Sequence, residues 1–343
     1  MKGLETGKVP PEKLLELVLR FLGRPDPRVL VGPGIGEDAA VIDMGDALLV
    51  LAMDPITAAS RDIGWLSVHV NANDVATRGA APKWFLCTIL LPEGSGGDEL
   101  GEIMAQVDRA AKELGVSIVG GHTEVTPGLR SPIIVGVMAG ECPKSKYLAT
   151  GNAKPGDRIV MTKTAGIEGT AVISINYPDI LRAPGDLIER SRAFLRSISV
   201  VEEAAVAAGI DGVHALHDPT EGGILGGVWE MAAASGLGAL VEGWRVPVAE
   251  ETRAICESLG IDPMKLLSSG SLLISVDPRA EEGLLRSLRA KGIRATGIGE
   301  MRERSFGVKL ADASGNLIDI ESPPRDSIYE VIERYAAISR GGG

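Results

Sequence analysis

Residues 32–43 read GPGIGEDAAVID, and three more acidic segments follow: LLVLAMDP at 48–55, VNANDVATRGA at 70–80 and VSIVGGHTEV at 116–125. Each segment follows or adjoins an apolar run that predicts a strand. If the fold gathers these segments at one end of a sheet, their carboxylates share one pocket. Two like charges about 4 Å apart repel by roughly 4 kcal/mol at an effective dielectric of about 20. The cluster therefore requires cations, or protons forced onto some of its members.

Magnesium suits such a cluster, because it prefers hard oxygen ligands and usually binds together with phosphate groups. The pattern therefore predicts an enzyme that uses a magnesium nucleotide. HDPTEGG at 217–223 adds a further candidate, since it joins a predicted strand to a helix start that suits an anion. The predicted magnesium ligands are Asp38, Asp54, Asp74, Glu124 and Asp218.

Two of these positions have structural alternatives. Asp54 precedes Pro55, and an acidic residue at a strand end often only starts a turn. Asn73 and Asp74 lie in an apolar helical pattern, where both residue types are disfavoured unless they cap a helix. Because Asn71 adds a third such side chain, a nucleotide site explains the Asn73–Asp74 pair better than a helix cap does.

The segment GGHTE at 120–124 follows a predicted buried strand. Gly120 and Gly121 let a ligand approach the backbone closely, and Glu124 supplies a carboxylate beside them. For His122, a backbone hydrogen bond in a loop is the commoner role, so we assign it no ligand function.

The glycines at 32, 34 and 36 resemble a dinucleotide-binding fingerprint, but their loop leads into a strand instead of a helix. No GK[ST] motif follows, so the loop does not fit a Walker motif. What remains is a flexible loop that ends in two carboxylates, with a plain loop before a strand as the alternative.

The composition indicates a two-domain enzyme rather than a nucleic-acid-binding protein. The 343 residues suffice for two ordinary domains, and a net charge of −11 offers no basic stripe to nucleic acid. Three scattered cysteines and four histidines predict neither a disulfide framework nor a zinc site. The sequence starts without a basic-then-apolar signal and contains no apolar stretch near about 20 residues. We therefore expect a cytoplasmic protein without a membrane span.

Strand and helix patterns alternate in the first half of the sequence and resume after a break. Strands are predicted at 39–43, 47–54, 81–92, 116–121 and 131–141, and helices at 11–23, 65–79 and 98–115. The turn-rich GNAKPG at 151–156 interrupts the pattern. We predict an α+β protein with domains at 1–150 and 151–343. The apolar run at 85–91 indicates either a sheet face covered by a second copy or burial beneath helices.

The order of the motifs resembles the PurM-type, AIR synthase-related superfamily of ATP-binding proteins. GEDAAV, Asp54, NDVATRGA, GGHTE, KPGD and HDPTEGG follow one another between about residues 30 and 300. The segments KPGDRIVMTKTAGIEGTAV and SSGSLLISV are most similar to the branch of the hydrogenase maturation factor HypE.

This resemblance implies a PurM-like N-terminal mixed-sheet domain that pairs across a homodimer into a barrel, followed by a C-terminal α/β sandwich. It also implies that ATP lies in the cleft between them with Mg²⁺. Asp218 would close the site from the second domain, and Glu124 would occupy the acidic position after the double glycine. The residues implied to bind the nucleotide are Gly34, Gly36, Asp38, Asp54, Asn73, Asp74, Gly120, Gly121 and Glu124, and those implied to be catalytic are Asp38, Asp74 and Asp218.

The sequence departs from the HypE branch at its end. That factor ends in a cysteine whose thiol carries the carbamoyl group to be dehydrated. Here the last residues are Arg340-Gly341-Gly342-Gly343, and Cys256 lies in a predicted helix. We therefore expect a related protein with another acceptor.

Three functional hypotheses follow. The first is an ATP- and magnesium-dependent enzyme that phosphorylates or activates an oxygen of an unidentified acceptor. A small-molecule kinase of the thiamine-monophosphate type is the enzymatic alternative. The third is a nucleotide-binding assembly or regulatory factor in metalloenzyme maturation with little turnover. The expected partners are a nucleotide, an acceptor, a second copy of the chain and a maturation protein.

Overall fold

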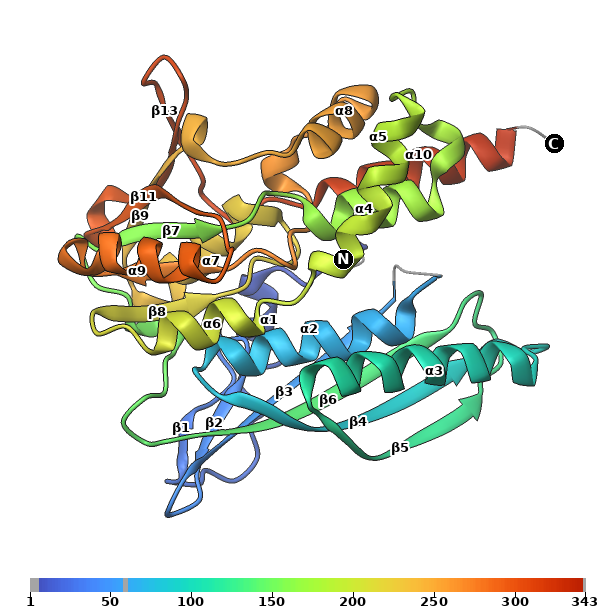
Figure 1. Ribbon diagram of the computed structural model, residues 1–343, viewed down its shortest axis with the longest axis horizontal. Coiled ribbons are helices and arrows are strands. Elements are labelled where there is room, and N and C mark those ends of the chain that lie inside the picture. Colours follow the sequence, from blue (N-terminus) through green and yellow to red (C-terminus); the bar gives the residue numbers. More distant parts are fainter. Residues whose placement is uncertain (1–5, 58–60, 342–343) are drawn as a thin grey trace.

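The computed structural model describes residues 6–57 and 61–341, which form two units, each built on one mixed sheet (Figure 1). The first sheet has six strands in the order β1-β2-β3-β6-β4-β5, of which only β4 and β5 run parallel. Its strands are β1 (Val29–Val31), β2 (Ala40–Asp43), β3 (Leu48–Ile56), β4 (Ala81–Leu91), β5 (Ser117–Val125) and β6 (Ile133–Cys142).

The second sheet has seven strands in the order β13-β12-β9-β11-β7-β10-β8. They are β7 (Arg158–Thr162), β8 (Val213–His217), β9 (Gly238–Glu242), β10 (Leu273–Val276), β11 (Ala295–Arg302), β12 (Val308–Ala311) and β13 (Leu317–Asp319). The helices of this unit are α4 (Ile167–Asn176), α5 (Gly185–Arg192), α6 (Val201–Ala208), α7 (Gly223–Ser235), α8 (Glu250–Leu259), α9 (Pro278–Ala290) and α10 (Ser327–Gly341). The predicted α+β class, with a mixed sheet followed by an α/β sandwich, is confirmed.

Helices α2 (Ile63–Thr77) and α3 (Gly97–Leu114) cover one face of the first sheet (Figure 1). Helix α2 also contacts α6 and β8 of the second unit, so it is enclosed on all sides. Every residue of α2 except Trp65 is buried. A helix that is buried all round must find internal partners for its polar side chains. This requirement makes α2 the structural centre of the site.

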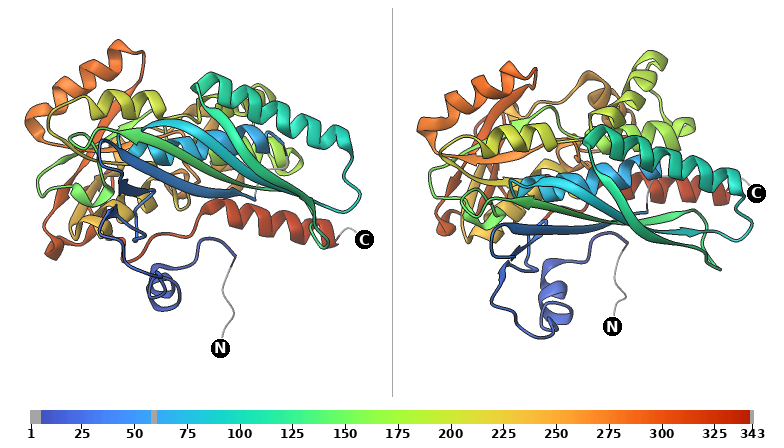
Figure 2. Two further views of the ribbon diagram at one scale, coloured as in Figure 1. Left: turned by 90° about the horizontal axis from the view of Figure 1, so that it is seen from below. Right: turned by 60° about the horizontal axis from the view of Figure 1, so that its bottom comes forward.

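Three local predictions were wrong. The first helix, α1 (Pro11–Leu17), ends earlier than predicted and buries none of its residues, because it stands apart from the body of the molecule (Figure 2). Strand β5 was predicted to be buried, yet it is the edge strand of its sheet and is exposed along its length. Helix α10 was not predicted, and it continues to Gly341. The domain division near residue 150 stays a prediction.

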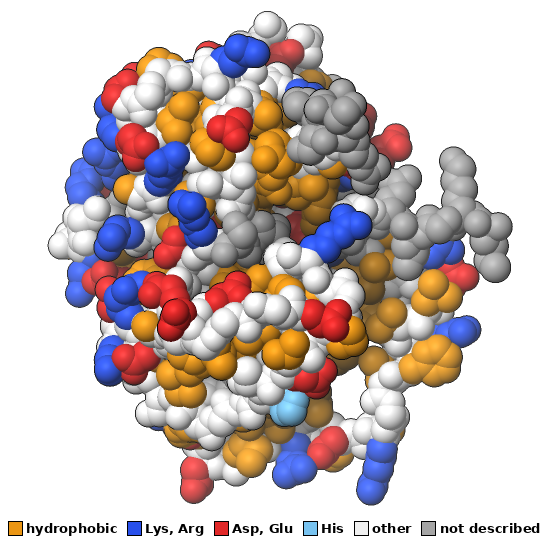
Figure 3. Space-filling model, turned by 90° about the vertical axis from the view of Figure 1, so that its right-hand side faces the viewer, with side chains coloured by type: hydrophobic (Ala, Val, Ile, Leu, Met, Phe, Trp, Pro, Cys, Tyr) orange, Lys and Arg blue, Asp and Glu red, His pale blue; other side chains and the backbone are white. Residues whose placement is uncertain are grey.

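The outer face of the first sheet carries apolar side chains. In β4 the burial alternates: Phe85, Cys87 and Ile89 point toward the helices, whereas Leu86 is exposed. Burial beneath helices therefore explains only alternate residues of the apolar run. Orange hydrophobic side chains also lie among acidic ones on the face seen in Figure 3. Among the described residues, none of the helices combines the length and apolar character needed to span a bilayer.

Candidate active site

A cavity of about 520 Å³ lies where the two units meet. Its walls come from the amino-terminal segment, the glycine loop before β2, the end of β3, helix α2, the loop after β8 and the segment before α10. This volume falls in the range of small-molecule sites, about 300–1,000 Å³. The predicted residues that line it are Gly34, Gly36, Asp38, Asp54 and Asp74.

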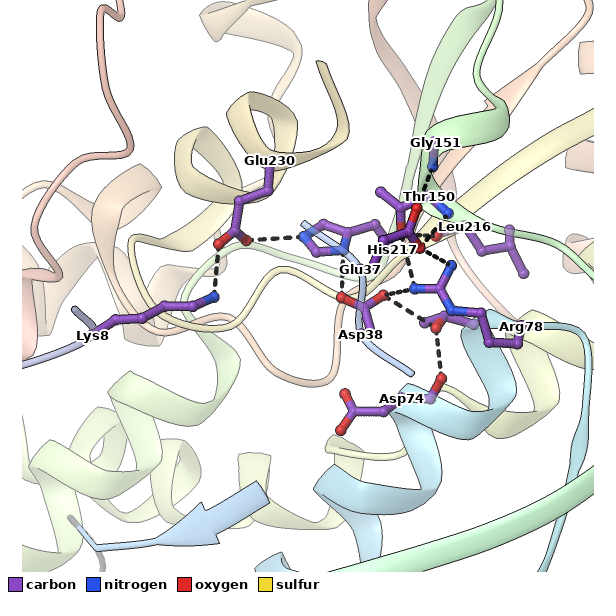
Figure 4. Close-up of polar contacts among 11 residues, drawn as sticks. Lys8, Glu37, Asp38, Asp74, Arg78, Thr150, Gly151, Leu216, His217 and Glu230 are labelled. Atoms are coloured by element: carbon purple, nitrogen blue, oxygen red, sulfur yellow. Dashed lines mark hydrogen bonds and ion pairs between the residues drawn. The ribbon is translucent and has the colours of Figure 1, made fainter. Parts of the chain in front are cut away.

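Asp38 sits at the centre of a chain of alternating charges along the cavity floor (Figure 4). Its Oδ2 lies 2.8 Å from Nη2 of Arg78, and its Oδ1 lies 2.8 Å from Nδ1 of His217. The His217 contact is an ion pair whose angle falls short of a well-directed hydrogen bond. Arg78, with none of its side chain exposed, also pairs with Glu37 at 3.2 Å. Both oxygens of Asp38 are therefore already paired with cations.

The chain of charges continues from His217 to the amino-terminal segment. Nε2 of His217 lies 3.1 Å from Glu230, and Glu230 pairs with Nζ of Lys8 at 2.7 Å. Burial alone would lower the pKa of His217, but Asp38 and Glu230 outweigh it and raise this pKa to about 10. Burial likewise opposes ionisation of Glu230, yet His217 and Lys8 lower its pKa to about 2. These groups are therefore charged at neutral pH.

Three other carboxylates in the same region lack such partners. Asp54, Asp74 and Asp218 form no ion pair in the part of the chain that the structure describes, and both oxygens of Asp218 lack hydrogen-bond partners. Burial, with the neighbouring carboxylates, raises the pKa of Asp54 to about 6 and that of Asp218 to about 8. Burial and the same neighbours raise the pKa of Asp74 well above its ordinary value. Without a metal cation, Asp218 holds its proton at neutral pH, Asp54 releases its proton near pH 6, and ionisation of Asp74 is disfavoured.

Local structure explains how the three carboxylates meet. Asp54 is fixed through its backbone, because the Asn71 amide accepts from the Asp54 N–H at 2.8 Å and donates to its carbonyl at 3.3 Å. Asp74 and Arg78 are four residues apart at the end of α2, so they face the same side. Gly36 has φ +77°, and a Cβ there would lie 2.5 Å from the Glu230 carbonyl. Only glycine therefore allows its loop to pack against α7.

The arrangement fits magnesium bound together with a polyphosphate. Among residues 6–57 and 61–341, no three His, Cys, Asp or Glu side chains form a complete metal cage. Magnesium does not need one, since it usually keeps several waters and binds one or two carboxylates plus phosphates. The buried, unpartnered oxygens of Asp218 supply ligands of the right hardness. Asp218 itself is not among the residues that line the cavity, whereas Asp54 and Asp74 line it and add two carboxylates.

Several predicted nucleotide-binding residues lie elsewhere in this chain. Glu124 is on the edge strand β5 with 52% of its side chain exposed, and it contacts His122 and Thr126. Glu124, Gly120 and Gly121 do not line the cavity, because two strands, β6 and β4, separate β5 from β3.

Asn73 also faces away from the cavity. Its amide donates to the Ile198 carbonyl at 2.9 Å and accepts from the Val200 N–H at 2.9 Å. The side-chain amide of Asn73 is therefore occupied by backbone groups, and its nucleotide contact stays a prediction. Asn73 instead joins α2 to the second unit.

The prediction missed the cations of the site. Arg78 could have been found from its spacing of four residues after Asp74 at the end of an apolar helix. His217 directly precedes Asp218 in the motif HDPTEGG, but a single histidine in a sequence does not by itself indicate that it belongs to a binding site. Lys8 is remote in sequence from every acidic motif, and Glu230 lies within the helix that follows HDPTEGG. Only the fold brings them together.

Two family models match the chain. The AIR synthase related protein N-terminal domain matches residues 36–142, and the corresponding C-terminal domain matches residues 154–310. A putative hydrogenase expression/formation protein of Methanocaldococcus jannaschii is 29% identical, covering 95% of this chain and 97% of its own. The carbamoyl dehydratase HypE of Escherichia coli is 30% identical, covering 86% and 89%.

Solved structures of similar proteins share the fold. HypE in a HypE–HypF complex superposes with a TM-score of 0.75 at 25% identity, covering 91% of this chain and 99% of the other. The hydrogenase maturation protein HypE in complex with ATP superposes with a TM-score of 0.66 at 25% identity, covering 93% and 95%.

Proposed function

Because this chain belongs to the AIR synthase-related family, we propose that its acidic cavity binds magnesium ATP and serves in hydrogenase maturation. The observation that carries the proposal is the trio of the buried Asp74 and Asp218 with the partly buried Asp54, which lacks ion-pair partners among the described residues. A related HypE crystallised with ATP supports the choice of nucleotide. When bound, magnesium neutralises the polyphosphate and orients the γ-phosphate for attack.

The residues of the chain have separate tasks in this proposal. Asp54, Asp74 and Asp218 hold the cation once they lose their protons. Arg78 and His217 hold Asp38 in place, so we assign Asp38 the task of positioning the two units instead of direct contact with the metal. The γ-phosphoryl group moves to an oxygen of an acceptor, and ADP leaves.

The acceptor in this proposal is a separate molecule or a partner protein. Of the three cysteines in the sequence, all are buried, and burial raises the pKa of Cys256 to about 12. None of them offers an accessible thiolate, since reactive cysteines need exposure and a low pKa. The HypE–HypF complex of a relative supports a maturation protein as a partner. Unpaired buried thiols agree with a reducing, cytoplasmic compartment.

We also propose a homodimer formed through the outer face of the first sheet. On this face Met53 and Leu86 have 64% and 37% of their surface exposed, and the edge strand β5 beside it leaves Ile118, Val119 and Val125 exposed as well. Contiguous exposed apolar groups are unfavourable in water and mark interaction surfaces. Sedimentation of the wild type against a Met53→Lys variant tests this, and a wild-type monomer would exclude the dimer.

ADP release from ATP tests the enzymatic proposal. With magnesium and the right acceptor we expect ADP to form, and with magnesium ATP alone we expect the midpoint of thermal unfolding to rise. A raised midpoint without ADP under any condition would favour a nucleotide-binding assembly factor. A midpoint that magnesium ATP leaves unchanged would contradict both.

A further inference from the structure

The amino-terminal segment forms one wall of the cavity. Between Thr6 and Leu14, all residues except Lys13 line it, and we call residues 6–14 the strap. The strap ends in the first half of helix α1 (Pro11–Leu17), which buries none of its residues and stands off the body of the molecule (Figure 2). The strap is therefore held by a few contacts and not by extensive packing of α1.

Those contacts converge on Lys8. Its ammonium pairs with Glu230 at 2.7 Å, and its backbone N–H donates to Glu221 at 3.0 Å. The side chain of Lys8 is 52% exposed, whereas that of Glu230 is 7% exposed, so a cation on the strap reaches a carboxylate fixed in the floor. Next to it, Gly7 lies against the Tyr329 ring, where a Cβ would come within 2.9 Å.

The charge of Lys8 matters to any anion in the cavity. Along the floor, Lys8, His217 and Arg78 balance Glu230, Asp38 and Glu37. Withdrawing the strap removes one of the three cations and makes the cavity, which Asp54 and Glu221 also line, more negative. The carboxylates of the cavity would then repel a bound polyphosphate, and the side that the strap had covered would be open to solvent. Closure of the strap and nucleotide binding should therefore reinforce each other.

We propose that residues 6–14 are a strap that closes over the bound nucleotide, and that the Lys8–Glu230 ion pair is its latch. This inference rests on the proposed function for the identity of the ligand, but the latch itself exists in the free protein. Loss of the latch opens the strap in the absence of ligand and speeds release of the nucleotide.

Hydrogen–deuterium exchange of the free protein tests the latch. In Lys8→Met we expect the amides of residues 6–14 to exchange at least about tenfold faster than in the wild type, because a charge-assisted contact is lost. Lys13→Met is the matched control, since among the described residues the Lys13 ammonium pairs with Glu16 of its own helix, and its loss should leave exchange unchanged. Equal exchange in both variants and the wild type would overturn the proposal.

Gly7→Ala provides a second route that keeps the charge. Gly7 has φ +119°, so a side chain there is strained as well as crowded by Tyr329. We expect faster exchange of the strap amides in this variant too, and unchanged exchange would count against the strap as a fixed wall.

Release of a fluorescent N-methylanthraniloyl ATP, measured with magnesium by stopped flow, gives the functional readout. We expect release about tenfold faster from Lys8→Met than from the wild type or Lys13→Met. An unchanged release rate would overturn the role of the strap in retaining nucleotide. If the wild type binds no nucleotide, the proposed function fails, while the exchange result still decides the latch.

Discussion

Asp38 of the first unit and His217 of the second form an ion pair, with Oδ1 and Nδ1 2.8 Å apart. The pair connects the loop before β2 to the end of β8 in the floor of the cavity. Because His217 also faces Glu230, one imidazolium serves two carboxylates. The relative position of the two units at the site therefore depends on a positive charge at His217.

Replacement of His217 tests this dependence. Removing one partner of a buried ion pair typically costs about 3–5 kcal/mol, since the remaining charge is left uncompensated. We expect His217→Gln to lower the free energy of unfolding by a comparable amount, measured by denaturant titration. His122→Gln is the control, because His122 is 64% exposed on its side chain and should change stability by less than about 0.5 kcal/mol. Equal stabilities of the two variants would refute the role assigned to His217.

Asp218→Asn should separate nucleotide binding from folding. In the free protein the pKa of Asp218 is raised to about 8 by burial and Asp38, so its carboxyl group is neutral at pH 7 and asparagine resembles it. The midpoint of the free variant at pH 7 should therefore equal or exceed that of the wild type, because the wild type must take up a proton at Asp218 when it folds. Without a carboxylate for the cation, magnesium ATP should bind at least about tenfold more weakly, or about 1.4 kcal/mol. Thermal shift with magnesium ATP measures both quantities.

Asp43→Asn is the matched control for that experiment. Asp43 pairs with Lys144 on the surface and does not line the cavity, so its replacement should leave the nucleotide-induced shift intact. A wild-type shift in Asp218→Asn would remove Asp218 from the metal site.

The free protein should lose stability as the pH rises. Unfolded aspartates release their protons above about pH 3.8, whereas Asp54 and Asp218 keep theirs in the folded state up to pKa values of about 6 and 8. The folded state therefore binds more protons between pH 4 and 8, and the free energy of unfolding falls over that window. His217 acts in the same direction, between its unfolded pKa of 6.5 and its folded pKa of about 10.

A series of melting curves at about pH 5, 6, 7 and 8 measures this decline. Glu230 does not obscure it, because the pKa of Glu230 is lowered to about 2 and its contribution is lost only below about pH 4.5. Asp218→Asn should flatten the decline above about pH 6. A midpoint that rises between pH 5 and 8 would show that these carboxylates are ionised in the free protein.

The sequence predicted the acidic half of the site better than the basic half. Asp54, Asp74 and Asp218 stand at the ends of apolar segments, and topology brings such ends together. The cations that pair with Asp38 could not be predicted, because His217 reaches Asp38 only where the two units meet and Arg78 carried no recognised motif. Glu124 differs from the other carboxylates: its motif looked like theirs, but β5 lies at the far edge of the sheet within one chain, so its metal contact stays a prediction. Local sequence reports where a strand ends, and strand order decides what that end faces.

Neighbouring residues of α2 should therefore give opposite results. Asn73 bridges Ile198 and Val200 of the second unit, so Asn73→Ala leaves a buried carbonyl and a buried N–H without partners. Each such group costs about 1–3 kcal/mol, and the free energy of unfolding should fall accordingly. Asp74→Asn should lose magnesium ATP binding without lowering the stability of the free protein, since burial and the neighbouring carboxylates raise the pKa of Asp74 and so disfavour its charged form. If folded Asn73→Ala lost nucleotide affinity as Asp74→Asn does, with no change in denaturant midpoint, Asn73 would belong to the nucleotide site after all.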